Sequence, residues 1–413
     1  MSSSNSPIDN TQPWLTIVGI GEDGWEGLTP SARQAIDSAK ILYGGARHLA
    51  FIPSTAARSI PWPSPLAPAV KEILTVHRGR SSVVVLASGD PMLYGVGVPL
   101  TRSLDRSEYR VIPGVSAFSL ACARMGWPTA ETPLVSLVNR PIEELNRHLR
   151  PGQRLMIYSE DGTTPGAVAR MLVSSGYGAS RFEVFESLGG PAEKHHEAEA
   201  RSWPQDRCGD LNAIAVHCVA DPGARPLPLI PGLTEDAFET DGQLTKREVR
   251  AITLARLAPL PGQHLWDVGA GTGTIGIEWM RSHPSCACTA FEAREDRAQN
   301  IAANAKKLGT PGLRVILGAA PESFGGNRQP DAIFIGGGLS HENLFESCWT
   351  ALPSGGHLVV NAVTLSSEAR LVALQQEFGG DLVRIEIARA EAVGNELGWR
   401  PVMPITQWAV VKP

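Results

Sequence analysis

The chain has 413 residues, of which 43% are apolar, with 42 Gly, 32 Pro and a formal net charge of −5. Its apolar fraction excludes a disordered protein, and its length suffices for two or three domains with their own cores. The acidic balance argues against a nucleic-acid partner, and no run of about 18 apolar residues could cross a membrane. Six cysteines are too few for a disulfide scaffold. We therefore expect a cytoplasmic protein with neither a membrane nor a nucleic-acid partner.

Residues 1–13 lack the basic start and apolar stretch of a signal peptide, so we expect a disordered lead. The first predicted strand, 15–21, ends in the Gly-x-Gly-x-x-Gly sequence of residues 19–24. A dinucleotide site with this spacing would open a helix directly and carry an acidic residue about twenty positions later. The next helix is instead predicted over 31–39, with Thr29 as its N-cap, and no such acid follows. The motif therefore does not indicate a dinucleotide site.

Two further turn motifs follow apolar segments in the first half. Gly-Asp-Pro at 89–91 ends a predicted strand over 82–90, and Val-Ile-Pro-Gly-Val-Ser-Ala occupies 111–117. With the opening loop, their order and spacing resemble the tetrapyrrole (class III) S-adenosylmethionine (SAM) methylases over residues 14–220. The resemblance implies two α/β lobes, with SAM in the trough between them and the opening loop toward a tetrapyrrole. The residues that it implies for SAM are Gly89, Asp90, Pro91 and Ser116.

Three ionisable side chains elsewhere in the first half are also candidates for chemistry. Glu186 ends a predicted strand, where it could reach a substrate, and we keep both a catalytic and a structural interpretation of it. His195 and His196 could be acid–base groups, but the charges beside them favour a solvated segment.

The ten scattered tryptophans are expected in the core and in pocket walls.

Residues 221–232 contain four prolines, which exclude a helix or a central strand and predict a stiff connector. Lys and Arg number 21 against 22 acids in residues 1–232, and 16 against 20 in residues 233–413, so neither half is basic. Both halves alternate strand-like and helix-like segments. This alternation predicts two α/β halves with parallel, doubly wound sheets and ligand sites at the carboxyl ends of the strands.

The second half carries the strongest single motif. An apolar strand containing Asp267 is followed by Gly269, Gly271 and Gly273 and then by a predicted helix. Glycines let the backbone turn tightly and approach a ligand. Glu292 ends the next predicted strand, where a carboxylate can accept hydrogen bonds from both hydroxyls of a ribose.

This arrangement resembles motif I of class I SAM methyltransferases, which implies a doubly wound, Rossmann-like domain over residues 233–413. By that resemblance the first acid, Asp267, faces the amino group of the methionine part of SAM, and Glu292 holds the ribose. The adenine would lie near Ala319 and Ala320, or near Glu322.

Cys286 and Cys288 could share a strand face and bind a metal, but two core cysteines are favoured, and we expect no metal site.

The flanking segments 244–250, 331–338 and 355–365 are similar to a subfamily that methylates a corrin precursor and removes a carboxyl group in vitamin B12 (cobalamin) biosynthesis. Two fused methylases then imply C-methylation of a precorrin at carbon 5 by the first domain. They imply methylation at carbon 15 and decarboxylation of the ring C acetate by the second. One SAM per domain, a small tetrapyrrole substrate and a homo-oligomer are further implications. Cationic candidates for the substrate carboxylates are Lys246, also a catalytic candidate, Arg247 and Arg250.

Two other interpretations remain open at this point. In the first, the chain is a nucleic-acid or protein methyltransferase whose first half is a non-catalytic binding module; the net charges and the intact Gly-Asp-Pro loop weigh against it. In the second, the chain is a nucleotide-sensing regulatory protein, which would leave Asp267 and Glu292 without a reactive acceptor.

Overall fold

The computed structural model describes residues 13–413, so the expected lead at 1–13 lies, but for its last residue, outside the described part. The chain forms two compact units. The first holds the residues up to Arg140 together with Arg150–Ala224, and the second holds Pro141–Leu149 and Arg225–Pro413. The chain thus passes between the units inside the proline-rich segment, which contains no helix or strand. That the short helical segment Ile142–His148 belongs to the second unit was not predicted.

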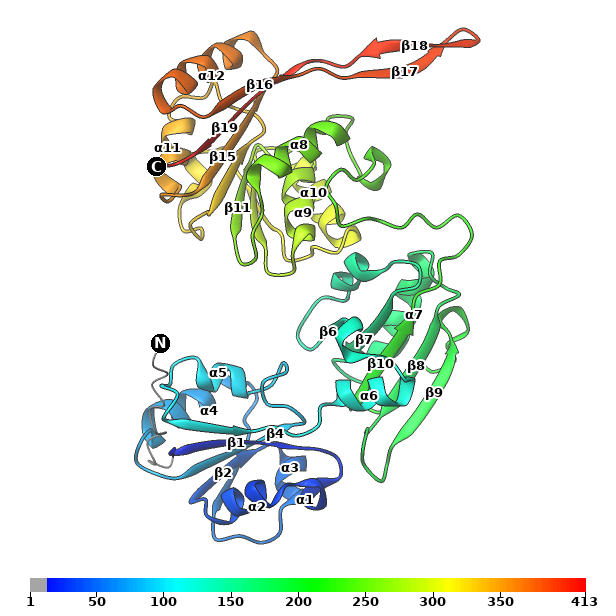
Figure 1. Ribbon diagram of the computed structural model, residues 1–413, viewed down its shortest axis with the longest axis vertical. Coiled ribbons are helices and arrows are strands. Elements are labelled where there is room, and N and C mark those ends of the chain that lie inside the picture. The colour runs from blue at the N-terminus through cyan, green and yellow to red at the C-terminus, as the bar shows by residue number, and fades with distance from the viewer. Residues whose placement is uncertain (1–12) are drawn as a thin grey trace, which may run out of the picture. The chain divides into compact units, whose positions relative to one another are not determined.

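The first lobe of the first unit is a parallel five-stranded sheet of order β3-β2-β4-β1-β5 (Figure 1). Apolar side chains pack on both faces of this sheet. Thr29 caps α2 as predicted, since its Oγ1 accepts a hydrogen bond from the Ala32 amide at 3.2 Å. The strands are β1 (Leu15–Ile20), β2 (Ile41–Gly44), β3 (Arg58–Pro61), β4 (Val83–Ser88) and β5 (Tyr109–Ile112). The helices are α1 (Gly24–Gly27), α2 (Pro30–Asp37), α3 (Ala46–Phe51), α4 (Ala67–Glu72) and α5 (Gly97–Thr101).

The second lobe corrects the expectation that every sheet is parallel. Its order is β6-β7-β10-β8-β9, and only β6 and β7 run parallel. No crossover helix joins β8 to β9, so the two strands form an antiparallel pair. His195 and His196 lie on the edge strand β9, whose side chains are exposed or half-buried, so the solvated segment predicted there is a strand. The strands are β6 (Leu134–Ser136), β7 (Arg154–Tyr158), β8 (Arg181–Glu186), β9 (Lys194–Glu199) and β10 (Asn212–His217); the helices are α6 (Ala117–Met125) and α7 (Thr164–Ser174).

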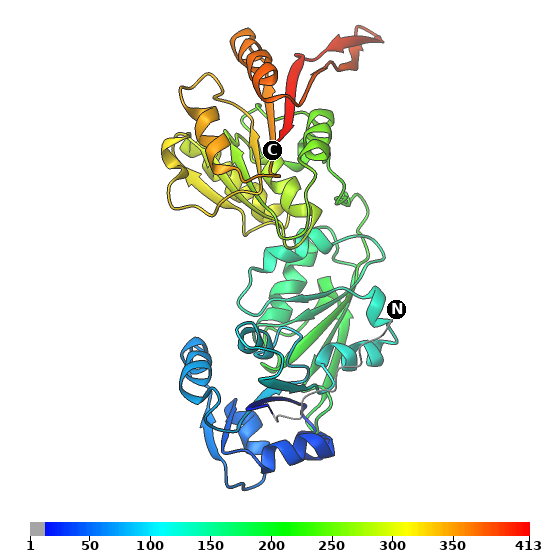
Figure 2. The same cartoon turned by 60° about the vertical axis from the view of Figure 1, so that its left-hand side comes forward.

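The second unit is a sheet with helices on both faces (Figures 1 and 2). It is doubly wound, and its strand order is β13-β12-β11-β14-β15-β19-β16. Its first five strands are parallel, which confirms the parallel, doubly wound arrangement predicted for these strands, and β19 runs antiparallel to both of its neighbours. Helices α8 to α10 pack on one face, and α11 and α12 on the other. The strands are β11 (His264–Val268), β12 (Ala287–Glu292), β13 (Arg314–Leu317), β14 (Ala332–Ile335), β15 (His357–Ala362), β16 (Asp381–Ile385) and β19 (Ile405–Val411). The helices are α8 (Arg247–Leu257), α9 (Thr274–Ser282), α10 (Glu295–Lys307), α11 (Leu344–Ala351) and α12 (Leu365–Phe378).

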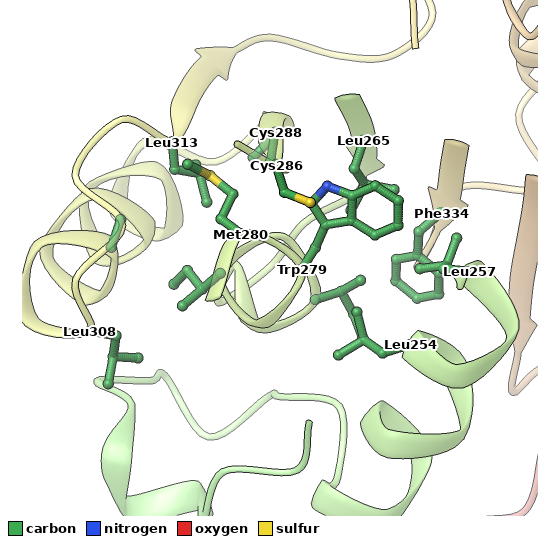
Figure 3. Close-up of a cluster of buried hydrophobic side chains, with 14 of the residues drawn as sticks. Leu254, Leu257, Leu265, Trp279, Met280, Cys286, Cys288, Leu308, Leu313 and Phe334 are labelled. Carbon is green, nitrogen blue, oxygen red and sulfur yellow. The ribbon is translucent and has the colours of Figure 1, made fainter. Parts of the chain in front are cut away.

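The core under α9 contains both cysteines that a metal could have used. Figure 3 shows Cys286 and Cys288 with Trp279 among the apolar side chains of this cluster. Both cysteines are buried free thiols, so the prediction of core cysteines is confirmed. Within residues 13–413, no group of three or more His, Cys, Asp or Glu side chains could hold a metal ion.

A hairpin of β17 (Ala388–Val393) and β18 (Glu396–Pro401) extends away from the sheet of the second unit (Figure 1). Trp399 on this hairpin is 78% exposed, which corrects the expectation that the tryptophans serve the core and pocket walls. Among the residues that the structure describes, no helix is long and apolar enough to cross a membrane.

Candidate functional site

The first unit contains a cavity of about 480 Å³ between its two lobes. The loops that follow β1, β4 and β5 at their carboxyl ends line one side, and residues of β7 and β10 contribute to the other. Its wall combines apolar side chains with polar and charged ones that could orient a small molecule. The carboxyl ends of parallel strands are where α/β sheets bind ligands. The cavity therefore lies where the sequence predicted a site.

Three glycines let the loops on the first-lobe side meet backbone to backbone. A Cβ on Gly19 would lie 1.9 Å from the carbonyl oxygen of Gly89 and 2.3 Å from the amide nitrogen of Gly114. The same carbonyl accepts a hydrogen bond from the Gly114 amide at 3.0 Å. Gly89 also has φ +55, which a residue with a side chain rarely adopts. Side chains at these positions would push the three loops apart.

The predicted cofactor residues of the first unit lie on these loops. Gly89, Asp90 and Ser116 line the cavity. Asp90 Oδ1 accepts a hydrogen bond from the Met92 amide at 2.9 Å, and Ser116 Oγ caps α6 by accepting one from the Ser119 amide at 3.0 Å. Pro91 is buried behind the loop, where its carbonyl accepts a hydrogen bond from the Gly97 amide. Three of the four residues thus face the cavity, and the fourth shapes the loop.

Glu186 lies on the opposite face of β8 from the cavity. Side chains alternate along a strand, and it is the preceding residue, Phe185, that lines the cavity. Glu186 is buried, and its Oε1 lies 3.1 Å from His196 Nε2. This pairing favours the structural interpretation of Glu186.

Sequence reasoning missed Arg47 and His48, which also line the cavity. Both lie on α3, directly after the carboxyl end of β2. That position was the available signal, because residues following a parallel strand gather at the ligand edge of the sheet. Tyr158 and Asn212 from the second lobe line the cavity too and were not predicted.

In the second unit the glycine loop follows β11. Gly269, Gly271 and Gly273 have φ values of +68, +60 and +77, a left-handed conformation that favours glycine. A Cβ on Gly273 would meet Ile301 at 2.8 Å, whereas one on Gly271 would meet nothing within 4 Å. The loop thus packs closely against the protein at Gly273 and borders open space at Gly271.

Asp267 lies on β11 just before this loop, and one of its two carboxylate oxygens accepts a hydrogen bond. Its Oδ2 accepts a hydrogen bond from the Gly276 amide at 2.9 Å, while Oδ1 is buried with no hydrogen-bond partner among the described residues. Burial raises the pKa of Asp267 to about 7. A cationic group placed beside the free oxygen would stabilise the charged form. This arrangement fits the ammonium group of a bound amino acid moiety.

Glu292 ties the glycine loop to the end of β12. Its Oε2 accepts a hydrogen bond from the Gly271 amide at 2.8 Å, and its Oε1 accepts one from the Arg294 amide at 3.0 Å. Each oxygen keeps further acceptor capacity for a hydroxyl donor. The Glu292 carbonyl accepts a hydrogen bond from the Gly318 amide, which places the adjoining loop with Ala319 and Ala320 beside this strand end. Glu292 and the adjoining loop therefore suit a ribose with its base nearby.

Arg250 has a structural role, which corrects its assignment to a substrate carboxylate. Its side chain is fully buried, and Nε lies 2.9 Å from Oε1 of the buried Glu278. The guanidinium also donates hydrogen bonds to the carbonyls of Thr245 and Leu233. Lys246 is half-buried at the N-cap position of α8, and its neighbour Arg247 is exposed. Of the cationic candidates, these two remain available to a ligand.

Comparison with known proteins gives each unit a family. Residues 14–202 match the tetrapyrrole (corrin/porphyrin) methylases, and residues 236–412 match the precorrin methyltransferase domain. Methyltransferases of this kind use SAM, and both glycine loops described above lie inside the matched ranges.

Three curated relatives extend this result. The precorrin-6Y C(5,15)-methyltransferase [decarboxylating] of Sinorhizobium sp is 47% identical over 410 residues, 99% of both chains. The cobalt-precorrin-7 C(5)-methyltransferase of Salmonella typhimurium is 33% identical over 204 residues, 49% of this chain and 98% of the relative. A probable cobalt-precorrin-6B C(15)-methyltransferase (decarboxylating) of Methanosarcina acetivorans is 29% identical over 175 residues, 41% of this chain and 94% of the relative. With full-length similarity at 47% identity, the chain belongs to the precorrin-6Y C(5,15)-methyltransferase (decarboxylating) family.

Proposed function

We propose that the protein transfers methyl groups from SAM to carbons 5 and 15 of a precorrin and decarboxylates the ring C acetate, in cobalamin biosynthesis. The observation that carries this proposal is the presence of two separate glycine-lined sites in one chain, each at the carboxyl ends of parallel strands. Their presence in a chain similar over its full length to a C(5,15)-methyltransferase supports two methyl transfers.

We assign carbon 5 to the first unit and carbon 15 with the decarboxylation to the second. Two half-length relatives support this division, because one is named as a C(5)-methyltransferase and the other as a decarboxylating C(15)-methyltransferase. The first unit matches the tetrapyrrole methylases and the second the precorrin methyltransferase domain. Each unit would then bind its own SAM.

In the first unit, Gly89, Asp90 and Ser116 would hold SAM against the loops that line the cavity, with Pro91 shaping the turn. In the second unit, Asp267 would pair with the ammonium group and Glu292 with the ribose hydroxyls. The loop at Ala319 and Ala320 would border the adenine. Gly271 would give the ligand its closest approach to the backbone, because no protein atom lies within 4 Å of a Cβ built there.

The chemistry asks the protein mainly to align two reactants. Bound SAM supplies an electrophilic methyl group, and the bridging carbon of a reduced tetrapyrrole is an enamine-like nucleophile. The carbon gains a methyl and loses a proton, and the sulfonium becomes a neutral thioether. Well-oriented reactants gain ~7–11 kcal/mol from such alignment. The rigid glycine contacts around Gly19 and Gly89 are suited to this task.

Mass spectrometry with a reduced precorrin and [methyl-¹³C]SAM tests the proposal. We expect the full-length protein to add two labelled methyl groups and to remove one CO2. Product with no mass change would refute the proposal. Equilibrium dialysis with labelled SAM should find two sites per chain, and a single site would refute the division between the units.

We also propose that the protein is a cytoplasmic homo-oligomer. The six unpaired cysteines suit a reducing compartment. A two-stranded hairpin is only marginally stable alone in water, yet β17 and β18 expose Val393, Leu397 and Trp399. A second copy of the hairpin would cover these side chains. Light scattering on the wild type and on Trp399→Asp checks this: a monomeric wild type would refute it, and dissociation of the variant would support it.

A further inference from the structure

The charges around the first cavity are unevenly distributed. Its lining includes four acidic side chains, Glu22, Asp90, Glu160 and Asp210. Among the described residues that line it, Arg47 is the one Lys or Arg. Of the Lys, Arg, Asp and Glu side chains in this lining, only Arg47 carries a charge that attracts an anion. Within this lining, its guanidinium is therefore the candidate contact for a carboxylate-bearing ligand.

Arg47 is held by contacts from the ends of two strands of the first lobe and from its neighbour on α3, His48. Its Nη1 lies 2.9 Å from Oε1 of Glu22, which follows β1. Its Nη2 donates a hydrogen bond to Ser88 Oγ, at the end of β4, at 3.3 Å, and lies 3.1 Å from Nε2 of His48. The side chain nevertheless remains 37% exposed. The guanidinium is thus fixed in direction and still accessible to a ligand.

His48 makes Arg47 the single permanent cation of this group. The His48 side chain is buried, and its Nε2 also lies 3.1 Å from Ser88 Oγ. Burial, reinforced by the charge of Arg47, lowers the pKa of His48 to about 4, so the imidazole is neutral at neutral pH. A neutral Nε2 can accept a hydrogen bond from the Arg47 guanidinium. The imidazole therefore helps to orient the guanidinium without adding a competing charge.

We propose that Arg47 binds a side-chain carboxylate of the tetrapyrrole in the first cavity and that Glu22 competes with this carboxylate for the guanidinium. The inference rests on the proposed function, because it takes a polycarboxylate substrate for this cavity. Arginine suits the role, since its planar donors pair with carboxylates in a defined geometry. The contact would set which edge of the macrocycle enters first and so which bridging carbon meets the methyl group.

Steady-state kinetics of the full-length protein test the proposal. The measured quantities are KM and kcat for the precorrin in methylation at carbon 5, followed by the ¹³C signal of the transferred methyl, and the Kd for SAM. We expect Arg47→Gln to raise KM about tenfold, as for loss of one partly exposed charge-assisted contact, with little change in kcat or in the SAM Kd. The KM of Arg47→Lys should lie between that of the wild type and that of Arg47→Gln. Higher salt should reduce the difference in KM between Arg47→Gln and the wild type, because salt screens the attraction between the guanidinium and the substrate carboxylate.

Glu22→Gln gives the sharper half of the test. Removing the competing carboxylate should lower KM a few-fold, the opposite direction from Arg47→Gln. A purely structural ion pair would make both variants worse in the same direction. Arg33→Gln is the matched control, because Arg33 pairs with Glu26 at 3.5 Å in the same lobe and does not line the cavity. Its KM should equal that of the wild type.

These measurements distinguish substrate binding by Arg47 from a structural role and from a role in cofactor binding. Equal rises in KM for the Arg47 and Glu22 variants, or a weaker SAM Kd in Arg47→Gln, would overturn the proposal in favour of a structural or cofactor role. If Arg47→Gln fails to fold, as judged by circular dichroism, Arg47→Lys and Glu22→Gln still decide the matter by the sign of their effects. A wild type that transfers no methyl to carbon 5 would instead refute the proposed function, whatever the variants do.

Discussion

Gly19 and Gly89 approach so closely that a Cβ on Gly19 would lie 1.9 Å from the Gly89 carbonyl oxygen. Backbone atoms cannot rotate away as a flexible side chain can, so the added methyl must push the loops apart. We expect Gly19→Ala to lower the free energy of unfolding by about 1–3 kcal/mol, as for overpacking, and to impair methylation at carbon 5. Thermal unfolding and the ¹³C product assay measure these effects.

The matched control for that change is Gly45→Ala. A Cβ there would meet His48 Nδ1 at 3.5 Å, an ordinary contact, and Gly45 has φ −60. This variant should retain nearly all of its stability. If Gly19→Ala were as stable and as active as Gly45→Ala, the close packing of the three loops would not be needed for the first site.

The second site offers an equally direct comparison of two glycines. Gly271 and Gly326 have φ values of +60 and +72, and neither would place a Cβ within 4 Å of another atom. Valine should therefore strain both backbones similarly, by roughly 1–2 kcal/mol. Only Gly271 belongs to the loop that donates to Glu292. We expect Gly271→Val to abolish methylation at carbon 15 and CO2 release, and Gly326→Val to retain both.

Equal loss in the two variants would mean that strain, rather than blocked ligand access, stops the reaction. Methylation at carbon 5 gives the internal reference in each case. If Gly271→Val lost both methylations equally, the two sites would not be independent.

The glycine loops were predictable because they depend on local rules. A glycine needed at positive φ, an acid at a strand end and a regular strand–helix alternation all leave marks within a few residues of one another. Gly269, Gly271 and Glu292 accordingly lie together as expected. The same alternation predicted the parallel arrangement that five strands of the second unit adopt.

Features that depend on distant partners were not predictable in this way. Arg250 and Lys246 are both cationic residues of the same predicted segment, but only Arg250 pairs with Glu278, 28 residues away, in the core. The position of Arg47 directly after a strand was a local signal, but the orientation of its guanidinium depends on Glu22 and Ser88, which the fold brings together from other strand ends. The β17–β18 hairpin, by contrast, had a local signal that was overlooked: Gly394-Asn395 separates its strands.

The unpaired oxygen of Asp267 makes a pH prediction for the second site. Burial raises the pKa of this carboxyl to about 7, and the ammonium group of SAM would favour the charged form. Below pH about 7 the free protein therefore holds a proton that must leave on binding. Affinity should rise with pH, by up to tenfold per unit, and level off above about 7. The KM for SAM in methylation at carbon 15 reports on this site.

Asp267→Asn is the control for that titration. It removes the charge, so binding should be weaker and should lose this pH dependence. An unchanged pH profile in the variant would show that another group titrates. An Asp267→Asn protein with wild-type affinity would contradict the pairing with the ammonium group.

The buried pair of Arg250 and Glu278 yields the clearest stability prediction. Glu278 also accepts hydrogen bonds from the amides of Gly232 and Leu233, so it anchors the segment that precedes α8. Arg250→Met would leave this carboxylate buried without its cation. We expect a loss of about 3–5 kcal/mol in the free energy of unfolding of the second unit. Arg256→Met on the same helix breaks only a surface pair with Asp381, at 2.8 Å, and should cost less than about 1 kcal/mol.

Denaturant unfolding of the full-length variants, followed by circular dichroism, measures both effects. The same experiment separates a structural Arg250 from one that binds substrate. A structural residue loses stability first and leaves the precorrin KM unchanged under conditions where the variant is folded. A substrate ligand would show the reverse, a raised KM with near-normal stability. Because the Arg250 side chain is fully buried and already donates to two backbone carbonyls, a substrate carboxylate could reach it only if α8 moved, and we expect the structural result.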